Sequence, residues 1–264
     1  PPDTVDAVVM EATYGDRDHP EESPLEQLET ILADILERKA VLLVPSFALG
    51  RAQALVVLLD QLFRARPELE LPLYLSSPMA AEVTELYRNY PDEHRLTPAD
   101  MDTAFGRVRV IEHYRRALRM DRRDGPLVII AGSGMLTGGR ILGHLLGHGG
   151  DPENRVLLTG YQAPGTRGRA LLDGERVLKI QGKMFEVRAQ VDMLEGLSAH
   201  ADRGELRRWL AAAPRRPRQV WLVHGEPQAR AALAEALRVD AGADPDFNVS
   251  ELPEGETQDI VSTR

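Results

Sequence analysis

Short apolar runs alternate along the chain with longer segments in which apolar residues recur every three or four positions. Mainly apolar runs at 5–10, 41–44 and 127–130 predict buried strands. Periodic segments at 25–36 and 52–66 predict helices with one apolar face. The same two patterns predict further strands at 73–75, 154–159 and 220–223, a helix ending at 146, and helices at 79–90, 163–172, 206–212 and 229–237.

This alternation predicts an α/β fold with a mainly parallel sheet flanked by helices, because parallel strands need a crossover element between them. Residues 91–123 show neither pattern and are expected to form an irregular basic segment. From residue 175 to 191 strand-like alternation dominates. We therefore expect a domain boundary between residues 160 and 174.

Composition limits the candidate chemistry. The chain has 264 residues, of which 43% are apolar, so it can bury a sizeable core. It has no cysteine, which excludes disulfides and leaves histidine and carboxylate side chains as metal ligands. No apolar run approaches the roughly 18–20 residues of a membrane span, so no membrane partner is expected, and the composition favours a cytoplasmic protein.

The net charge of −9 means that a nucleic-acid partner must be met by a local basic surface. Two segments offer one: residues 107–123, with seven arginines, and residues 214–218, which read Pro-Arg-Arg-Pro-Arg. A solvated face or a turn is the simpler explanation of both segments.

Two histidines follow predicted strands near the end of the sequence. His200 lies between small residues just before a predicted helix, where Asp202 can cap the helix N-terminus. His224 ends a buried strand and is followed by Gly225. An imidazole at such a position serves as a general acid or base or as a metal ligand, although each histidine alone is as well explained by a structural role. Glu11, at the end of the first strand, is a site carboxylate or a surface acid.

The other five histidines have no ligand-like neighbours in the sequence, and we expect them at the surface. His144 and His148 are four residues apart, so one helix face can present both, but a metal site there needs a third ligand. The remaining three are His19, His94 and His113.

Two loops between strands and helices are rich in small residues. Residues 45–51 precede a long helix, and such a loop leaves backbone N–H groups free for an anion. Gly132 and Gly134 follow another strand and resemble part of a dinucleotide-binding fingerprint, but Thr137 stands where its third glycine should be. A tight turn explains this loop as well as a phosphate cradle does.

Five segments in order resemble the β-CASP branch of the metallo-β-lactamase superfamily of nucleases, which includes RNase J and the nuclease subunit of the cleavage and polyadenylation factor. The resemblance is closer to the group of the factor subunit than to RNase J. The matching segments are MEATYG at 10–15, PSFALGRAQ at 45–53, GSGM at 132–135, LSAHAD at 197–202 and VHGE at 223–226.

The resemblance implies a metal-dependent ribonuclease that hydrolyses single-stranded RNA. It implies that Glu11 pairs with a catalytic His200, which assists the leaving group or orients the scissile phosphate, and that His224 is a ligand of one of two zinc ions. It also implies a substrate groove lined by two loops, with Ser46, Phe47, Gly50, Arg51, Ser133, Gly134 and Met135 as contacts.

The sequence departs from the family pattern in one respect. The family's His-x-His-x-Asp-His motif, which supplies most zinc ligands, does not occur. We therefore expect a fragment that does not hold both zinc ions and is inactive alone. It would comprise residues 1–14 from the end of an N-terminal metallo-β-lactamase segment, 15–165 as the β-CASP domain and 166–264 as a C-terminal metallo-β-lactamase segment, part of an αββα domain.

Two other interpretations remain, and self-association is also expected. A non-catalytic RNA-binding or scaffold homologue keeps the fold without the ligands, although it has no chemical need for Glu11, His200 and His224 together. A nucleotide-cofactor enzyme using Gly132 and Gly134 predicts dinucleotide binding. An apolar surface left open without the N-terminal half would favour a homodimer.

Overall fold

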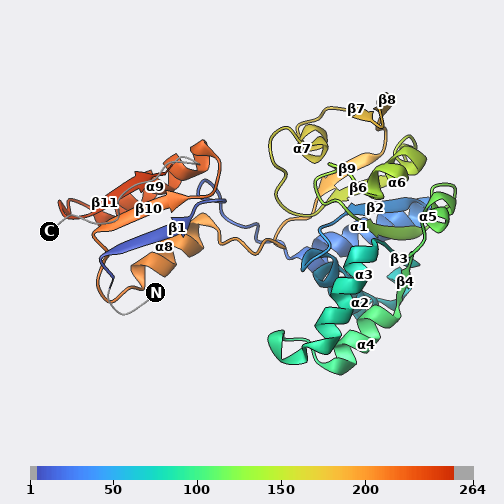
Figure 1. The fold of residues 1–264 in the computed structure, drawn as a ribbon, viewed down its shortest axis with the longest axis horizontal. Helices are drawn as coiled ribbons and strands as arrows, with labels where there is room; N and C mark the ends of the chain where they lie inside the picture. Colours follow the sequence, from blue (N-terminus) through green and yellow to red (C-terminus); the bar gives the residue numbers. More distant parts are fainter. Residues whose placement is uncertain (1–4, 253–264) are drawn as a thin grey trace. The chain divides into compact units, whose positions relative to one another are not determined.

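The computed structural model describes residues 5–252, which form two compact units. The larger unit is a single stretch, residues 21–197, whereas the smaller unit combines residues 5–20 with residues 198–252. Figure 1 shows both units, coloured along the chain. No helix among the described residues is long and apolar enough to cross a membrane.

The larger unit is built on a six-stranded sheet with strand order β4-β3-β5-β2-β6-β9. Every neighbouring pair is parallel, and β2, β3 and β5 carry buried side chains throughout. The strands are β2 (Val41–Pro45), β3 (Leu73–Ser76), β4 (Val108–Val110), β5 (Leu127–Ala131), β6 (Arg155–Leu158) and β9 (Gln190–Met193).

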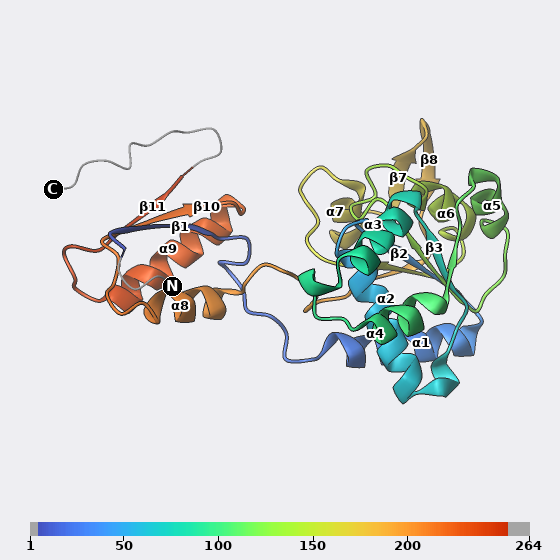
Figure 2. The ribbon, with the colours of Figure 1, turned by 60° about the horizontal axis from the view of Figure 1, so that its bottom comes forward.

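Helices cover both faces of this sheet, as its alternating side chains require (Figure 2). Leu42, Val44 and Val128 face one core, together with the buried sides of α1 (Pro24–Arg38), α2 (Arg51–Ala65), α3 (Pro78–Asn89) and α4 (Pro98–Gly106). Val41 and Leu43 face the other core, together with α5 (Tyr114–Met120), α6 (Ile141–His148), α7 (Arg167–Leu172) and the hairpin of β7 (Val177–Ile180) and β8 (Lys183–Glu186). Short 3₁₀ turns lie at Pro67–Leu69 and Pro91–Glu93.

This architecture confirms the predicted α/β fold with a parallel sheet between helices. The expectation that residues 91–123 are irregular was wrong, because they contain α4, the edge strand β4 and α5. Thr97 starts α4 with a capping box in which its side chain and that of Asp100 each accept a backbone N–H of the other. The strand β4 is only three residues long and mostly exposed, so it lacks the apolar pattern of a buried strand.

The smaller unit has a three-stranded parallel sheet in the order β1-β10-β11. Its strands are β1 (Ala7–Glu11), β10 (Gln219–Val223) and β11 (Asn248–Glu251), and its helices are α8 (Arg203–Ala211) and α9 (Pro227–Ala241). Val8 and Met10 pack with Leu222 into a core that also contains Leu206 of α8 and Leu233 of α9. The first strand therefore belongs with the last part of the chain.

The two units divide the chain at different places from those expected. We expected boundaries at 14/15 and 165/166, but the compact units change at 20/21 and 197/198. Residues 166–197 stay in the larger unit because β9 pairs with β6 and the β7–β8 hairpin packs on the second core. Residues 15–20 stay in the smaller unit, where Gly15 packs against α9 and the Arg17 carbonyl accepts the Arg203 N–H.

Candidate active site

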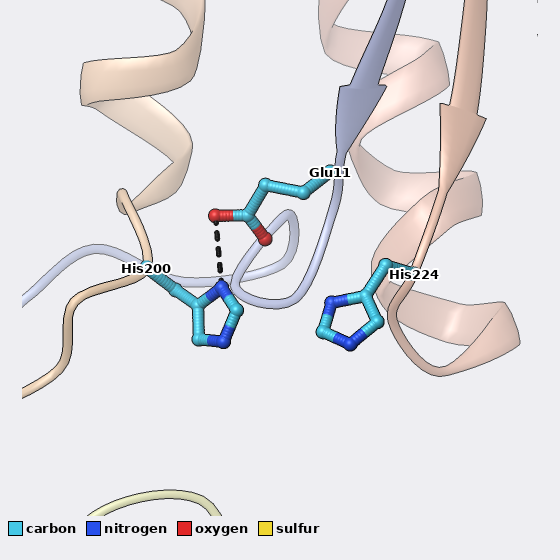
Figure 3. A group of neighbouring side chains, drawn as sticks. All are labelled: Glu11, His200 and His224. Atoms are coloured by element: carbon cyan, nitrogen blue, oxygen red, sulfur yellow. Dashed lines mark ion pairs between the residues drawn. The ribbon is translucent and has the colours of Figure 1, made fainter. Parts of the chain in front are cut away.

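Three side chains meet at the carboxyl end of the small sheet. Glu11 is the last residue of β1, and it is in register with Val223, the last residue of β10. His224 therefore follows directly beside Glu11, and His200 approaches from the loop that precedes α8 (Figure 3). Parallel pairing of two strands thus brings together residues that are more than 180 positions apart in the sequence.

The backbone segments that follow β1 and β10 lie very close together at this point. The Ala12 N–H donates to the His224 carbonyl at 2.8 Å. A Cβ on Gly225 would lie 2.5 Å from the Ala12 carbonyl oxygen, and the residue has φ +129°. Only glycine fits such a position, which explains why Gly225 follows the histidine.

Glu11 and His200 form an ion pair when the imidazole is protonated. Their closest atoms, Glu11 Oε1 and His200 Nδ1, are 3.2 Å apart (Figure 3). The carboxylate also accepts the Ala201 N–H at Oε1 and the Thr13 N–H at Oε2. Burial raises the pKa of Glu11, but hydrogen bonds from Thr13 and the charge of His200 outweigh this effect, so the pKa is lowered overall. Glu11 is therefore an anion whose carboxylate is placed to orient His200.

Asp202 fixes the loop that carries His200. As predicted, it caps α8: its Oδ1 accepts the Glu205 N–H at 2.6 Å, and the Glu205 side chain accepts the Asp202 N–H. Its Oδ2 accepts the His19 N–H at 3.0 Å, which ties the loop to residues after β1. Burial raises the pKa of Asp202, but the hydrogen bonds from the His19 and Glu205 backbones and nearby positive charges lower it overall.

Thr13 contacts all three site residues, and no pattern in the sequence indicates this role. Its Oγ1 lies 3.0 Å from His224 Nδ1 and 3.4 Å from His200 Nδ1. The two imidazole rings are 5.3 Å apart between centroids. A threonine two residues after a strand end is an ordinary turn residue in the sequence, so only the fold identifies its contacts.

The donor set of this cluster suits zinc. Glu11, His200 and His224 each offer a ligand atom, and these atoms lie within 4.8 Å of one another. Nitrogen and carboxylate oxygen are zinc ligands. Both oxygens of Glu11 already accept backbone N–H groups, however, and its carboxylate pairs with His200, so His224 is the residue best placed to serve as a ligand.

A second group, His19 with Asp202 and Glu205, has atoms equally close together. Both Asp202 oxygens accept backbone N–H groups, and Glu205 completes the capping box. The His19 Nε2 lies 3.1 Å from the His200 carbonyl oxygen. These contacts explain the group as the start of a helix.

The expectation that all five other histidines lie at the surface was wrong for two of them. His144 and His148 are 1% and 5% exposed on the inner side of α6. His144 bonds to the Asp121 carboxylate through Nδ1 and to the Ser76 hydroxyl through Nε2, while His148 Nε2 donates to the Met120 carbonyl. Burial lowers the pKa of His148. Each ring is committed to protein partners, so the pair does not resemble a metal site.

The two predicted substrate loops are neighbours in the larger unit because β2 and β5 pair side by side. The Ser46 N–H donates to the Ala131 carbonyl, and Gly134 lies so close to Phe47 that a Cβ would be 2.9 Å from its ring. Packing against Phe47 therefore explains the glycine at position 134 without a dinucleotide-binding loop. Phe47 itself is 44% exposed.

Other residues of these loops are held mainly by the protein. The Ser133 hydroxyl accepts the Thr137 N–H and bonds the Thr137 side chain, so it closes its own turn. Met135 accepts the Gly168 N–H through its carbonyl. Arg51 donates to the Leu197 carbonyl, and Gly50 starts α2 with φ +75°. The loops belong to the larger unit and the three-residue cluster to the smaller one.

Comparison with known proteins gives two domain matches. Residues 52–171 match the Beta-Casp domain, and residues 184–249 match the Zn-dependent metallo-hydrolase RNA specificity domain. The name of the second domain supports the use of zinc by the family that shares this domain.

Curated relatives match nearly the whole chain. Ribonuclease TTHA0252 of Thermus thermophilus is 37% identical over 244 residues, which cover 89% of this chain and 55% of that protein. Transcription termination factor FttA of Pyrococcus horikoshii is 32% identical, with 88% and 38% covered. Cleavage and polyadenylation specificity factor 73 of Drosophila melanogaster is 30% identical, with 94% and 36% covered.

The chain spans about half the length of the Thermus relative and less than half of the other two. The matches run through both compact units and agree with the parallel sheet between helices. The chain therefore belongs to the β-CASP family of metallo-β-lactamase-type nucleases.

Proposed function

We propose that the chain forms part of a zinc-dependent ribonuclease that hydrolyses phosphodiester bonds in single-stranded RNA. The observation that carries this proposal is the cluster of Glu11, His200 and His224 at the carboxyl ends of β1 and β10. Membership of a nuclease family supports it, and one relative is named as a ribonuclease.

Each residue of the cluster has a distinct task in this proposal. Glu11 stays ionised and holds His200 through Nδ1, so the Nε2 of His200 is available for the phosphate or the departing oxygen. A positioned proton donor at that oxygen avoids the release of an unstabilised alkoxide. His224 serves as a metal ligand through Nε2, since its Nδ1 faces Thr13.

Zinc, when bound, supplies an activated water and neutralises phosphate charge. We propose that two ions act together and that most of their ligands lie outside these 264 residues. Support comes from the small donor set, in which Glu11 is already engaged with His200 and backbone N–H groups. We accordingly expect no nuclease activity from the 264-residue chain alone.

RNA is proposed to contact the larger unit at the loops after β2 and β5. The exposed ring of Phe47 can stack on a base, and Gly50, with nothing within 4 Å of an added Cβ, leaves backbone accessible to a phosphate. Gly134 is buried beneath the Phe47 ring and is proposed to hold that ring in place. Hydrogen bonds within the protein engage Ser46, Arg51, Ser133 and Met135, and we propose that these residues shape the loops.

A basic helix adds to this RNA-binding surface in the proposal. Arg115, Arg116, Arg119 and Arg122 are exposed on or just after α5, and no ion pair joins them to an acid within residues 5–252. Arg119 and Arg122 also line a surface hollow of about 560 Å³ beside α6. The N-terminal side of α5 is tied to the loop after β5, because Arg140 donates to the Ile111 and Glu112 carbonyls.

The test measures cleavage and binding separately. A labelled single-stranded RNA is incubated with the 264-residue chain and with the longer protein that we propose contains it, each with zinc and with a chelator. We expect both proteins to bind RNA and only the longer protein with zinc to cleave it. Binding without cleavage by the longer protein would instead identify a non-catalytic RNA-binding or scaffold homologue.

A further inference from the structure

We propose that Thr13 is a positioning residue whose hydroxyl fixes the tautomer of His224 in the cluster. The catalytic meaning of this inference rests on the proposed function, whereas the hydrogen-bond arrangement does not. Thr13 is only 8% exposed and is held within the same turn as Glu11.

The threonine hydroxyl lies between the two rings. Its oxygen is 3.0 Å from His224 Nδ1 and 3.4 Å from His200 Nδ1, so both rings turn the same nitrogen toward it. The Thr13 backbone N–H donates to Glu11 Oε2 at 2.8 Å, and hydrogen bonding by Thr13 helps to lower the pKa of that carboxyl group. Thr13 therefore contacts both imidazoles through its hydroxyl and the carboxylate through its backbone.

The donors and acceptors around Thr13 limit how the hydrogens can be arranged. An ionised carboxylate only accepts, so His200 Nδ1, 3.2 Å from Glu11 Oε1, must carry a hydrogen. A hydroxyl has one hydrogen, and in the proposal Thr13 points it toward the Glu11 carboxylate, which can only accept. The Thr13 oxygen is then an acceptor, and His224 Nδ1 must donate to it.

The result for each neutral ring is a hydrogen on Nδ1 and a free lone pair on Nε2. Nε2 of His224 is then the only ring atom able to bind a metal, and Nε2 of His200 faces away from its carboxylate partner (Figure 3). Hydrogen bonds to the second ring nitrogen set the tautomer of metal-binding histidines in general. Thr13 supplies this bond for His224, and Glu11 supplies it for His200.

The fold holds the hydroxyl where this arrangement needs it. The preceding Ala12 bonds the His224 backbone, and Gly225 packs against the Ala12 carbonyl. A β-branched side chain has a restricted χ1, so the hydroxyl direction is fixed together with the backbone. Valine has nearly the same shape without the hydroxyl, and serine keeps the hydroxyl without the methyl group.

The experiment compares Thr13→Val with Thr13→Ser in the ¹⁵N-labelled 264-residue chain at pH 8. Long-range ¹H–¹⁵N correlation spectra report which ring nitrogen carries the hydrogen. We expect the Nδ1–H form for both histidines in the wild type and in Thr13→Ser. In Thr13→Val we expect His224 to shift toward the Nε2–H form, while His200 keeps its tautomer through Glu11. Amide spectra of the α9 residues check that each variant is folded.

An Nε2–H form of His224 in the wild type would overturn the proposal, and so would an unchanged His224 in folded Thr13→Val. Cleavage by the longer protein is a separate measurement. Thr13→Val is expected to lower zinc-dependent cleavage about 10–100-fold with unchanged RNA affinity, and Thr13→Ser to restore it. If wild-type protein does not cleave RNA but the tautomers are as stated, the proposed function fails and the hydrogen-bond assignment stands.

Discussion

At the scale of single residues, the site depends on one carboxylate that has several partners. Glu11 accepts hydrogen bonds from two backbone N–H groups and pairs with His200, so its charge is spread over the loop and the imidazole. Glutamine in place of Glu11 keeps the shape of the side chain but loses its charge. Its amide N–H₂ group would also face a backbone N–H donor where Glu11 has an accepting oxygen.

We expect Glu11→Gln in the longer protein to reduce the rate of RNA cleavage by about 10²–10⁴-fold, the usual value of a positioned acid or base. RNA affinity should change little, because Glu11 makes no proposed contact with the substrate. Single-turnover rates and filter binding measure the two quantities. A cleavage rate within threefold of the wild type would show that Glu11 does not support His200.

Asp202 makes a matching prediction for stability against pH. Its pKa is lowered in the folded chain, so its stabilising effect is complete above its unfolded pKa and is lost as the pH falls through the lower, folded value. Asp202→Ala should cost about 0.5–2 kcal/mol at neutral pH through loss of the cap. Thermal unfolding from pH 7 to pH 3 should show the wild-type advantage shrinking in acid. An advantage that stays constant over this range would contradict the assigned role.

The sequence predicted the position of these residues better than their partners. His144 and His148 were expected at the surface, yet Ile141, His144, Leu145 and His148 recur with helical spacing and form one buried face. That spacing was the available signal. The contacts of Thr13 had no such signal, because they depend on two strands that are adjacent only in the folded chain.

At the scale of elements, close backbone contacts hold the strand ends in place. Gly225 lies where the turn after β10 meets the turn after β1. Its φ is positive, and the Ala12 carbonyl leaves no room for a Cβ. Gly204 lies in the first turn of α8. The nearest atom to a Cβ added there would be the flexible end of Arg208 at 3.0 Å, followed by two carboxylate oxygens.

We expect Gly225→Ala to lower the free energy of unfolding of the smaller unit by about 1–3 kcal/mol, the usual cost of a strained backbone position. Gly204→Ala is the matched control and should be neutral or slightly stabilising, because alanine favours a helix. Chemical denaturation of both variants makes the comparison. Equal stability of the two would mean that the Ala12–Gly225 contact does not set the site geometry.

The ion pairs of the two basic segments indicate which of them is the better candidate for RNA contact. Arg119 and Arg122 have no acidic partner within residues 5–252, whereas Arg215 and Arg216 pair with Asp6 and Asp244. The double variant Arg119→Glu/Arg122→Glu should weaken RNA binding and reduce its salt dependence. Arg215→Glu/Arg216→Glu should have a smaller effect on binding. The reverse order would place the RNA contact on residues 214–218.

The prediction of helices and strands failed where the apolar pattern was weak or where the structure depends on pairing between distant strands. The segment before β5 hides α4, whose capping box at Thr97 and Asp100 is visible in the sequence, and β4, which is too short to show a pattern. The compact units change at 197/198 and not at 165/166 because β9 pairs with β6, and nothing in residues 190–193 reveals this pairing. Long apolar runs and amphipathic helices were predicted well, since burial dictates both.

At the scale of the whole molecule, the chain order differs from the spatial order. Residues 5–20 complete the sheet of the last segment, whereas residues 21–197 form one continuous unit with two cores. We expect a protein of residues 21–197 to fold alone and to unfold cooperatively, as measured by circular dichroism and amide spectra. A collapsed state without dispersed amide signals would show that the larger unit needs the smaller one.

The most direct test of the proposed active site is zinc-dependent cleavage of a labelled single-stranded RNA by the longer native protein, compared between wild type and His200→Ala. We predict a loss of at least about 100-fold in the cleavage rate with unchanged RNA affinity, since His200 acts on the leaving group. A His200→Ala protein that cleaves at the wild-type rate would contradict the role of the Glu11–His200 pair.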